Sequence, residues 1–213
     1  CVFSRMIYGA SRTIFSSLIL VSLMFVFGSF IGIISGYIGG LFDNIVMRIV
    51  DVFLAFPSLV LAIAVAGVLG GGMINAMIAI GVIGWTKYAR LARGEVLEIK
   101  EETFIKAARL SGNSSMYIVF KHIMPRVLST LIVTASLDIG TTIMEMAALS
   151  FLGLSSPLPI PEWGAMMNEG KSMIQFAPWI TIAPGIAIFI IVILFNLLGD
   201  VVHDMLDPKQ KEY

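Results

Sequence analysis

Two acidic residues lie inside an apolar stretch of the chain and are the first candidates for chemistry. Asp138 and Glu145 fall within Val127–Leu154, a run long enough to cross a membrane. Seven residues are nearly two helical turns, so both carboxyl groups are expected on one face of a helix. An intramembrane charge costs at least ~2.5 kcal/mol, so such residues usually face a bundle interior or a water path. The pair indicates either a translocation pathway, one that could attract cations, or a buried hydrogen-bonding network.

Other residue types that do chemistry lack the required spacing. Neither His122 nor His203 belongs to a cluster with the spacing of a closed metal site. The motif His-Glu-x-x-His and the phosphate loop Gly-x-x-x-x-Gly-Lys-Ser/Thr do not occur. Ser136 and Ser150 have no intramembrane histidine to form a catalytic pair, and the thirteen methionines suit core packing. We expect no catalytic residue and no metal, and an intramembrane enzyme is the least favoured class.

The composition is that of a membrane protein. Of the 213 residues, 58% are hydrophobic and 13% are charged, whereas a soluble domain has about 25% charged residues. Fourteen basic residues balance fourteen acidic ones. A soluble globule, a disordered chain and a nucleic-acid-binding protein are thereby excluded, because the last two need charge for solvation or for phosphate contacts.

Five apolar stretches are candidate spans, each of which needs about 20 residues to cross ~30 Å of hydrocarbon. The third is short, and Lys87 is expected to extend its ammonium group to the membrane interface. The sequence thus predicts an all-α, polytopic helical bundle. The expected spans are Thr13–Ile34, Val52–Leu69, Met73–Trp85 with an extension to about Ala89, Val127–Leu154 and Trp179–Val201.

Positive charge sets the expected orientation. Eight of the fourteen basic residues fall between Lys87 and Arg126, which places that loop in the cytoplasm. Alternation of the five spans puts the N-terminus outside and the C-terminus, with Lys209 and Lys211, in the cytoplasm. We therefore expect a further span upstream of Cys1.

Residues 86–126 are too polar for the membrane and too long for a simple turn. Gly94–Leu110 is predicted as a helix, on which Glu102 and Lys106 are spaced to pair. Gly112-Asn113 is expected to end it, and a second short helix is expected over Met116–Ile123. The small residues at the turn would let this loop enter a groove of another protein, and the alternative is a solvated connection.

This loop resembles the EAA loop of ABC-transporter membrane subunits. Lys106-Ala107-Ala108-Arg109-Leu110-Ser111-Gly112 is followed, after nine residues, by His122-Ile123-Met124-Pro125. The alanines, glycine, proline and spacing match, whereas Lys106 replaces a glutamate, His122 an isoleucine and Met124 a leucine. Further segments resemble the peptide/nickel branch of the family: Phe3–Ala10, Gly36–Gly40, Asp51–Pro57, Ala147–Leu154, Glu162–Met166, Asn196–Asp200 and Leu206–Pro208.

The resemblance implies that residues 1–213 form a type I ABC importer transmembrane domain that lacks its first span. Such a permease subunit lies in the cell membrane of a prokaryote as a multi-pass protein. It pairs with a second related permease and receives substrate from an extracytoplasmic binding protein. Two cytoplasmic ATPase subunits bind ATP and Mg²⁺, so this chain is expected to bind no cofactor and to hydrolyse nothing. The resemblance places ATPase coupling at Glu102, Lys106, Ala107, Ala108, Arg109, Gly112 and Pro125.

The outer loop Ser155–Pro178 is expected to dock the binding protein or to form an outer gate. Glu162 and Trp163 are the candidate contacts, although Trp163 could equally pack at the membrane interface. The substrate stays open, because Glu145 lies where an acid is common in this branch, including peptide carriers, whereas Asp138 looks more like the nickel-carrying members. We expect import of peptides, nickel or nickel chelates. The alternative is a non-ABC ion channel or a structural membrane protein.

Overall fold

The computed structural model describes residues 1–155 and 160–206, and every regular element in these ranges is helical. Two short elements interrupt the α-helices, the π-helical turn η1 (Val119–Ile123) and the 3₁₀ turn η2 (Lys171–Met173). The predicted all-α bundle is confirmed. The α-helices are α1 (Val2–Ile38), α2 (Gly40–Leu54), α3 (Ser58–Leu69), α4 (Met73–Ile99), α5 (Thr103–Leu110), α6 (Ser115–Ile118), α7 (Met124–Phe151), α8 (Trp163–Gly170) and α9 (Trp179–Leu206).

The described residues contain three helices that are long and apolar enough to cross a membrane, or four if α2 and α3 count as one bent span. The three are α1, Ser115–Phe151 and the Trp179–Met205 part of α9. Helix α4 has 27 residues, but its second half carries Lys87, Arg90 and Arg93. The predicted third span, Met73–Trp85, forms the first half of α4.

The predicted second span, Val52–Leu69, is wrong as a single helix. Its first residues belong to α2, most of which lies between the first two predicted spans, and α2 and α3 meet at 88°. Pro57 stands at the break with φ −59° and ψ 124°. Because proline disfavours helical geometry at the residue before it, the helix must end near Phe56.

Glycines bring α1 and α4 into backbone contact. Gly28, Gly32 and Gly36 recur every four residues and share one face of α1. A Cβ atom at Gly28 would lie 2.3 Å from the carbonyl oxygen of Trp85, and one at Gly32 would lie 2.3 Å from that of Ala89. Small residues at this spacing let helices approach closely in membranes. This glycine interface makes α1 and α4 the most extensively packed pair of helices.

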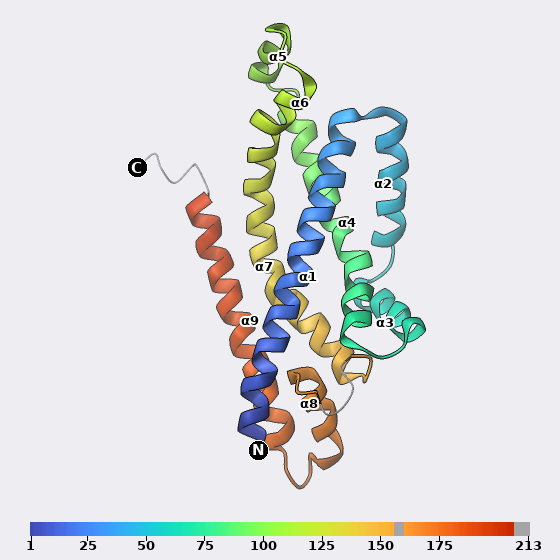
Figure 1. Ribbon diagram of the computed structural model, residues 1–213, viewed down its shortest axis with the longest axis vertical. Helices are drawn as coiled ribbons and strands as arrows, with labels where there is room; N and C mark the ends of the chain where they lie inside the picture. The colour runs from blue at the N-terminus through green and yellow to red at the C-terminus, as the bar shows by residue number, and fades with distance from the viewer. Residues whose placement is uncertain (156–159, 207–213) are drawn as a thin grey trace.

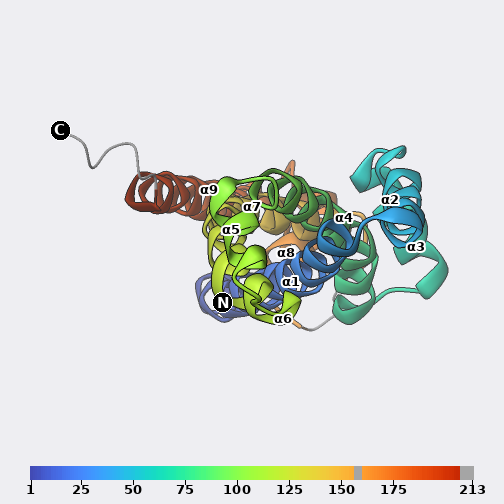
Figure 2. The ribbon, with the colours of Figure 1, turned by 90° about the horizontal axis from the view of Figure 1, so that it is seen from above.

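The helices run between two ends of an elongated bundle (Figure 1). The α5–α6 loop caps one end, and α8 lies at the other end, beside the N-terminus. Seen from above, α1, α4 and α7 lie in the middle, with α9 at one edge and α2 and α3 at the opposite edge (Figure 2). The α5–α6 loop and α8, which belong to the predicted cytoplasmic and outer loops, thus lie at opposite ends of the bundle (Figure 1).

Helix α6, the π-helical turn η1 and α7 form one continuous helix of 37 residues, Ser115–Phe151. The sequence predicted two separate helices here, Met116–Ile123 and a span that begins at Val127, with Pro125 between them. Instead, Pro125 lies in the first turn of α7, directly after η1. A proline lacks the N–H of an ordinary helical bond and crowds the preceding turn, and a π-helical turn supplies the local widening that accommodates it.

Candidate functional site

The loop that resembles the EAA motif is held to the bundle by apolar side chains and ion pairs. Ile105 and Ile118 are fully buried, and Arg126 Nη1 lies 2.8 Å from Glu102 Oε1. The predicted helix Gly94–Leu110 is wrong, because α4 ends at Ile99 and α5 begins at Thr103. Glu102 is therefore the N-cap residue of α5, and Lys106 pairs instead with Glu101 at 3.2 Å.

The outer surface of this loop is apolar. Leu110 is 90% exposed, and Met116, Tyr117 and Phe120 are also exposed. Ala107 and Arg109 are exposed beside them, whereas Ala108 is partly buried against the core. Gly112 has φ +81°, a backbone conformation that favours glycine at a turn after a helix. The space around its Cα is open, so no neighbouring atom would contact a Cβ there. Four exposed apolar side chains on so short a segment form a surface suited to another protein.

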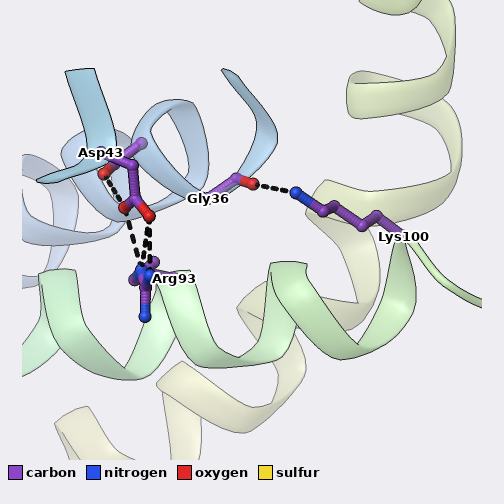
Figure 3. A network of polar contacts seen from close by, with 5 residues as sticks. Gly36, Asp43, Arg93 and Lys100 are labelled. Atoms are coloured by element: carbon purple, nitrogen blue, oxygen red, sulfur yellow. Dashed lines mark hydrogen bonds and ion pairs between the residues drawn. The ribbon is translucent and has the colours of Figure 1, made fainter. Parts of the chain in front are cut away.

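A polar network joins the turn between α1 and α2 to the second half of α4 (Figure 3). Arg93 Nη2 lies 2.6 Å from Asp43 Oδ2, and Arg93 Nε donates to Oδ1 at 2.9 Å. The Ser35 hydroxyl donates to Asp43 at 2.6 Å, and Lys100 Nζ donates to the Gly36 carbonyl at 3.0 Å. Asp43 is buried. The network fixes the end of the glycine interface nearest the α5–α6 loop, and the sequence analysis missed it.

The two intramembrane acids face one cavity of about 300 Å³, here called the α7 cavity. Asp138, Thr141, Thr142 and Glu145 line it from α7, since the spacing i, i+3, i+4, i+7 places them on one face. The predicted common face of Asp138 and Glu145 is thus what the structure has. The remaining lining residues come from the other helices: Met24, Leu54, Ser58, Ala62, Ile80, Ile83, Gly84, Thr86 and Lys87.

The two acids have different partners. Asp138 Oδ1 lies 2.6 Å from Lys87 Nζ, and the hydroxyl of the fully buried Tyr88 donates to Oδ2 at 2.8 Å. Glu145 accepts a hydrogen bond of 3.3 Å from the hydroxyl of Ser58, the first residue of α3. Among the described residues, no cation lies within ion-pair distance of Glu145. The ammonium group of Lys87, which was expected to extend to the membrane interface, binds Asp138 in this structure.

Glu162 and Trp163, the candidate contacts of the outer loop, are both buried. Ser150 Oγ donates to Glu162 at 2.7 Å, and the indole N–H of Trp163 donates to the Met6 carbonyl at 3.0 Å. Both residues therefore pack within the chain, and neither presents a surface to a binding protein in this conformation. Phe176 of the same loop, by contrast, is exposed.

Some expectations fall on residues that the structure does not describe. They concern Pro157 and Pro159 in the outer loop, the Asp207-Pro208 part of the last matching segment, and Lys209 and Lys211 of the basic tail. These positions lie outside the described residues.

Comparison with known proteins finds a family match over most of the chain. Residues 28–212 match the family described as binding-protein-dependent transport system inner membrane component. The chain is 43% identical over 210 residues to the dipeptide transport system permease protein DppC of Alkalihalophilus pseudofirmus, covering 99% of this chain and 69% of that protein. It is also 43% identical to the glutathione transport system permease protein GsiD of Pectobacterium atrosepticum, with 99% and 70% covered.

Solved structures share the fold. An inward-facing structure of the MetNI methionine ABC transporter matches with a TM-score of 0.74 at 20% identity, covering 95% of this chain and 96% of that chain. An amino acid ABC transporter with histidines matches with a TM-score of 0.66 at 14% identity, covering 93% and 92%. At such identities the likeness concerns the fold alone.

Proposed function

Because the chain belongs to the family of binding-protein-dependent transport system inner membrane components, we propose that it forms part of a pathway for short peptides. The chain is a permease component of an ABC importer, and its fold is that of type I importer permeases. Family membership excludes the ion-channel and structural-protein alternatives. The two relatives are named for dipeptide and for glutathione, both of which are short peptides, and this supports peptides as the substrate class.

Nickel and its chelates, the other substrates expected from the sequence, have less support. In residues 1–155 and 160–206, no group of three or more His, Cys, Asp or Glu side chains could hold a metal ion. The α7 cavity instead combines a lysine, two carboxylates and hydroxyl groups. That mixture suits a ligand with both charges better than a bare divalent cation, which prefers several oxygen, nitrogen or sulfur ligands.

The exposed apolar surface of the α5–α6 loop is the observation that carries the coupling proposal. Leu110, Met116 and Phe120 are exposed on this loop, which caps one end of the bundle (Figure 1). In the proposed assembly, this surface, with Ala107, Ala108 and Arg109 beside it, docks on one of two cytoplasmic ATPase subunits. A second, related permease completes the pathway. A binding protein delivers substrate at the end occupied by α8.

ATP and Mg²⁺ belong to the ATPase subunits in this proposal. The sequence contains no Gly-x-x-x-x-Gly-Lys-Ser/Thr loop to hold phosphates. Closure of the ATPase dimer on ATP would displace the docked loops and rock the two permeases between outward and inward access. Within this chain, the movement passes from the α5–α6 loop to Asp138 and Glu145, because α6 and both acids lie on the one continuous helix Ser115–Phe151.

The test uses the assembled importer in liposomes, with its binding protein and ATP. We expect saturable uptake of a radiolabelled dipeptide and no competition by nickel. The variant Leu110→Asp should lose the ATPase subunits on co-purification and lose uptake, because a charge replaces an exposed apolar contact. The matched control is Phe176→Asp, an equally exposed apolar residue at the opposite end, which should keep the ATPase subunits. Uptake of nickel without peptide uptake would contradict the proposed substrate, and full ATPase retention by Leu110→Asp would contradict the docking surface.

A further inference from the structure

Two acidic residues line the α7 cavity, and only one of them forms an ion pair. The charge of Asp138 is balanced by Lys87 at 2.6 Å, whereas the hydrogen-bond partner of Glu145 is the neutral hydroxyl of Ser58 at 3.3 Å. A carboxylate in a mostly apolar cavity is costly without a cation. An incoming ammonium group would supply that cation at Glu145.

Lys87 offers the complementary group. Its side chain is half exposed, and an ammonium group carries three donors, of which Asp138 uses one. Tyr88 also donates to Asp138, at 2.8 Å. Asp138 therefore keeps a hydrogen-bond donor if Lys87 turns partly toward an incoming carboxylate.

The spacing of the two groups sets a length. Asp138, which holds Lys87, and Glu145 are seven residues apart on α7, or about 10 Å along the helix axis. An extended peptide covers about 3.5 Å per residue, so two or three residues span this distance. The cavity volume of about 300 Å³ lies at the small end of the range for small-molecule sites.

We propose that the α7 cavity is a binding site on the pathway for zwitterionic peptides of two or three residues. Glu145 binds the free α-ammonium group, Lys87 binds the terminal carboxylate, and the hydroxyls of Ser58 and Thr141 line the path between them. The apolar wall formed by Met24, Ile80 and Ile83 faces the peptide side chains. This inference rests on the proposed function and specifies the chemistry that the pathway recognises.

Photo-crosslinking to the assembled importer without its binding protein tests the site directly. The probe is a dipeptide with a diazirine side chain, and labelled positions are mapped by mass spectrometry. We expect label on α3, α4 and α7 residues that line the cavity. Unlabelled dipeptide should compete at least tenfold better than its N-acetylated form, which lacks the ammonium group, and better than its C-terminal amide, which lacks the carboxylate.

Two variants assign the two charges. Glu145→Gln should abolish the preference for the free amine, and the charge-neutral double variant Lys87→Gln with Asp138→Asn should abolish the preference for the free carboxylate. Ser136→Ala is the control on the same helix, since Ser136 is not among the residues that line this cavity, and it should keep both preferences. If a charge variant does not assemble, the label map of the unaltered protein still decides.

Label confined to positions outside the cavity, or unchanged amine preference in Glu145→Gln, would overturn the inference. The proposed function is tested separately, by uptake with the binding protein present. Normal peptide uptake without labelling of the cavity removes the binding site alone. Absence of any peptide uptake by the unaltered importer removes the proposed function.

Discussion

At the scale of single residues, the absence of a side chain decides how α1 and α4 meet. Gly28 and Gly32 each allow a carbonyl oxygen of α4 to approach where a methyl group would overlap it. The clash partners are backbone atoms, which cannot move aside as a flexible side chain can. Close packing of this kind tolerates added volume poorly.

We therefore expect Gly32→Ala to lower the stability of the purified protein by about 1–3 kcal/mol, the usual cost of overpacking. The matched control is Gly67→Ala, since Gly67 is also helical and has open space around a built Cβ. That change should be neutral or stabilising, because alanine favours helix over glycine. Thermal unfolding in detergent measures both, and equal melting temperatures for the two variants would contradict the backbone contact.

Two ion pairs join α2 to α4 and differ in burial. Asp43 of the pair with Arg93 is 8% exposed, whereas both partners of the Asp51–Arg90 pair are about half exposed. Exposed pairs contribute about 0–1 kcal/mol. A buried carboxylate with several charge-assisted hydrogen bonds contributes more, about 1.5–3 kcal/mol for each bond.

Asp43→Asn should accordingly destabilise the protein by more than about 1.5 kcal/mol, and Asp51→Asn should cost less than about 1 kcal/mol. A double-mutant cycle of Asp43→Asn with Arg93→Gln, read by thermal unfolding, isolates the pair. A coupling energy near zero would show that the network of Figure 3 does not hold the turn between α1 and α2.

The sequence predicted the two acids of the α7 cavity but not the residues that bind them. Asp138 and Glu145 were visible because charge is rare in an apolar run, and their seven-residue spacing predicted the shared face. Their partners Lys87, Tyr88 and Ser58 lie 51, 50 and 87 positions away along the chain, and no local pattern reports such pairings. The glycine interface had a local signal, the four-residue repeat of Gly28, Gly32 and Gly36, which the sequence analysis did not use.

At the scale of elements, the break between α2 and α3 shapes the α7 cavity. It turns the chain by 88° and places Ser58, at the start of α3, beside Glu145. A straight helix over Val52–Leu69 would carry Ser58 elsewhere. Hydropathy identified the apolar stretch but could not show the bend, because each half keeps a helical sequence on its own side of Pro57.

We expect Pro57→Ala to loosen this bend, because alanine removes the restriction on Phe56 and supplies a helical N–H. Spin labels at Ile49 and Val68, both exposed, report the angle in a Cys1→Ser background. Their distance distribution should broaden and shift to longer values in Pro57→Ala. An unchanged distribution would mean that tertiary packing alone maintains the bend.

At the scale of the whole molecule, the bundle has two chemically different ends. The end formed by the α5–α6 loop carries Lys106, Arg109 and Lys121, and the α8 end carries the pair of Arg5 with Glu169 at 2.6 Å. The positive-inside rule predicts the first end in the cytoplasm. Alternation of the predicted spans placed the α5–α6 loop and the outer loop that contains α8 on opposite sides, because alternation depends only on the order of the spans. The extent of α4 and the continuity of Ser115–Phe151 required the structure.

Labelling from each side of the membrane tests the orientation. In a Cys1→Ser background expressed without the ATPase subunits, which would cover Leu110, Leu110→Cys should react with an impermeant maleimide only in inside-out vesicles, and Phe176→Cys only in right-side-out vesicles. Both positions are highly exposed at opposite ends of the chain. The reverse pattern would contradict the predicted cytoplasmic side, and reaction of both cysteines from one side would contradict the arrangement of the spans.

The unbroken helix Ser115–Phe151 also constrains which changes of length the chain can accept. Each residue advances a helix by about 100°, with 3.6 residues per turn. A single inserted residue between Phe120 and Asp138 would therefore swing either the α5–α6 loop or both acids to a different side. Insertions in this stretch should be tolerated only when compensated locally, as the π-helical turn before Pro125 already absorbs one irregularity. The number of residues in this stretch therefore fixes the angle between the α5–α6 loop and the two acids, so an insertion or deletion in α7 changes the direction in which side chains point more than the length of the helix.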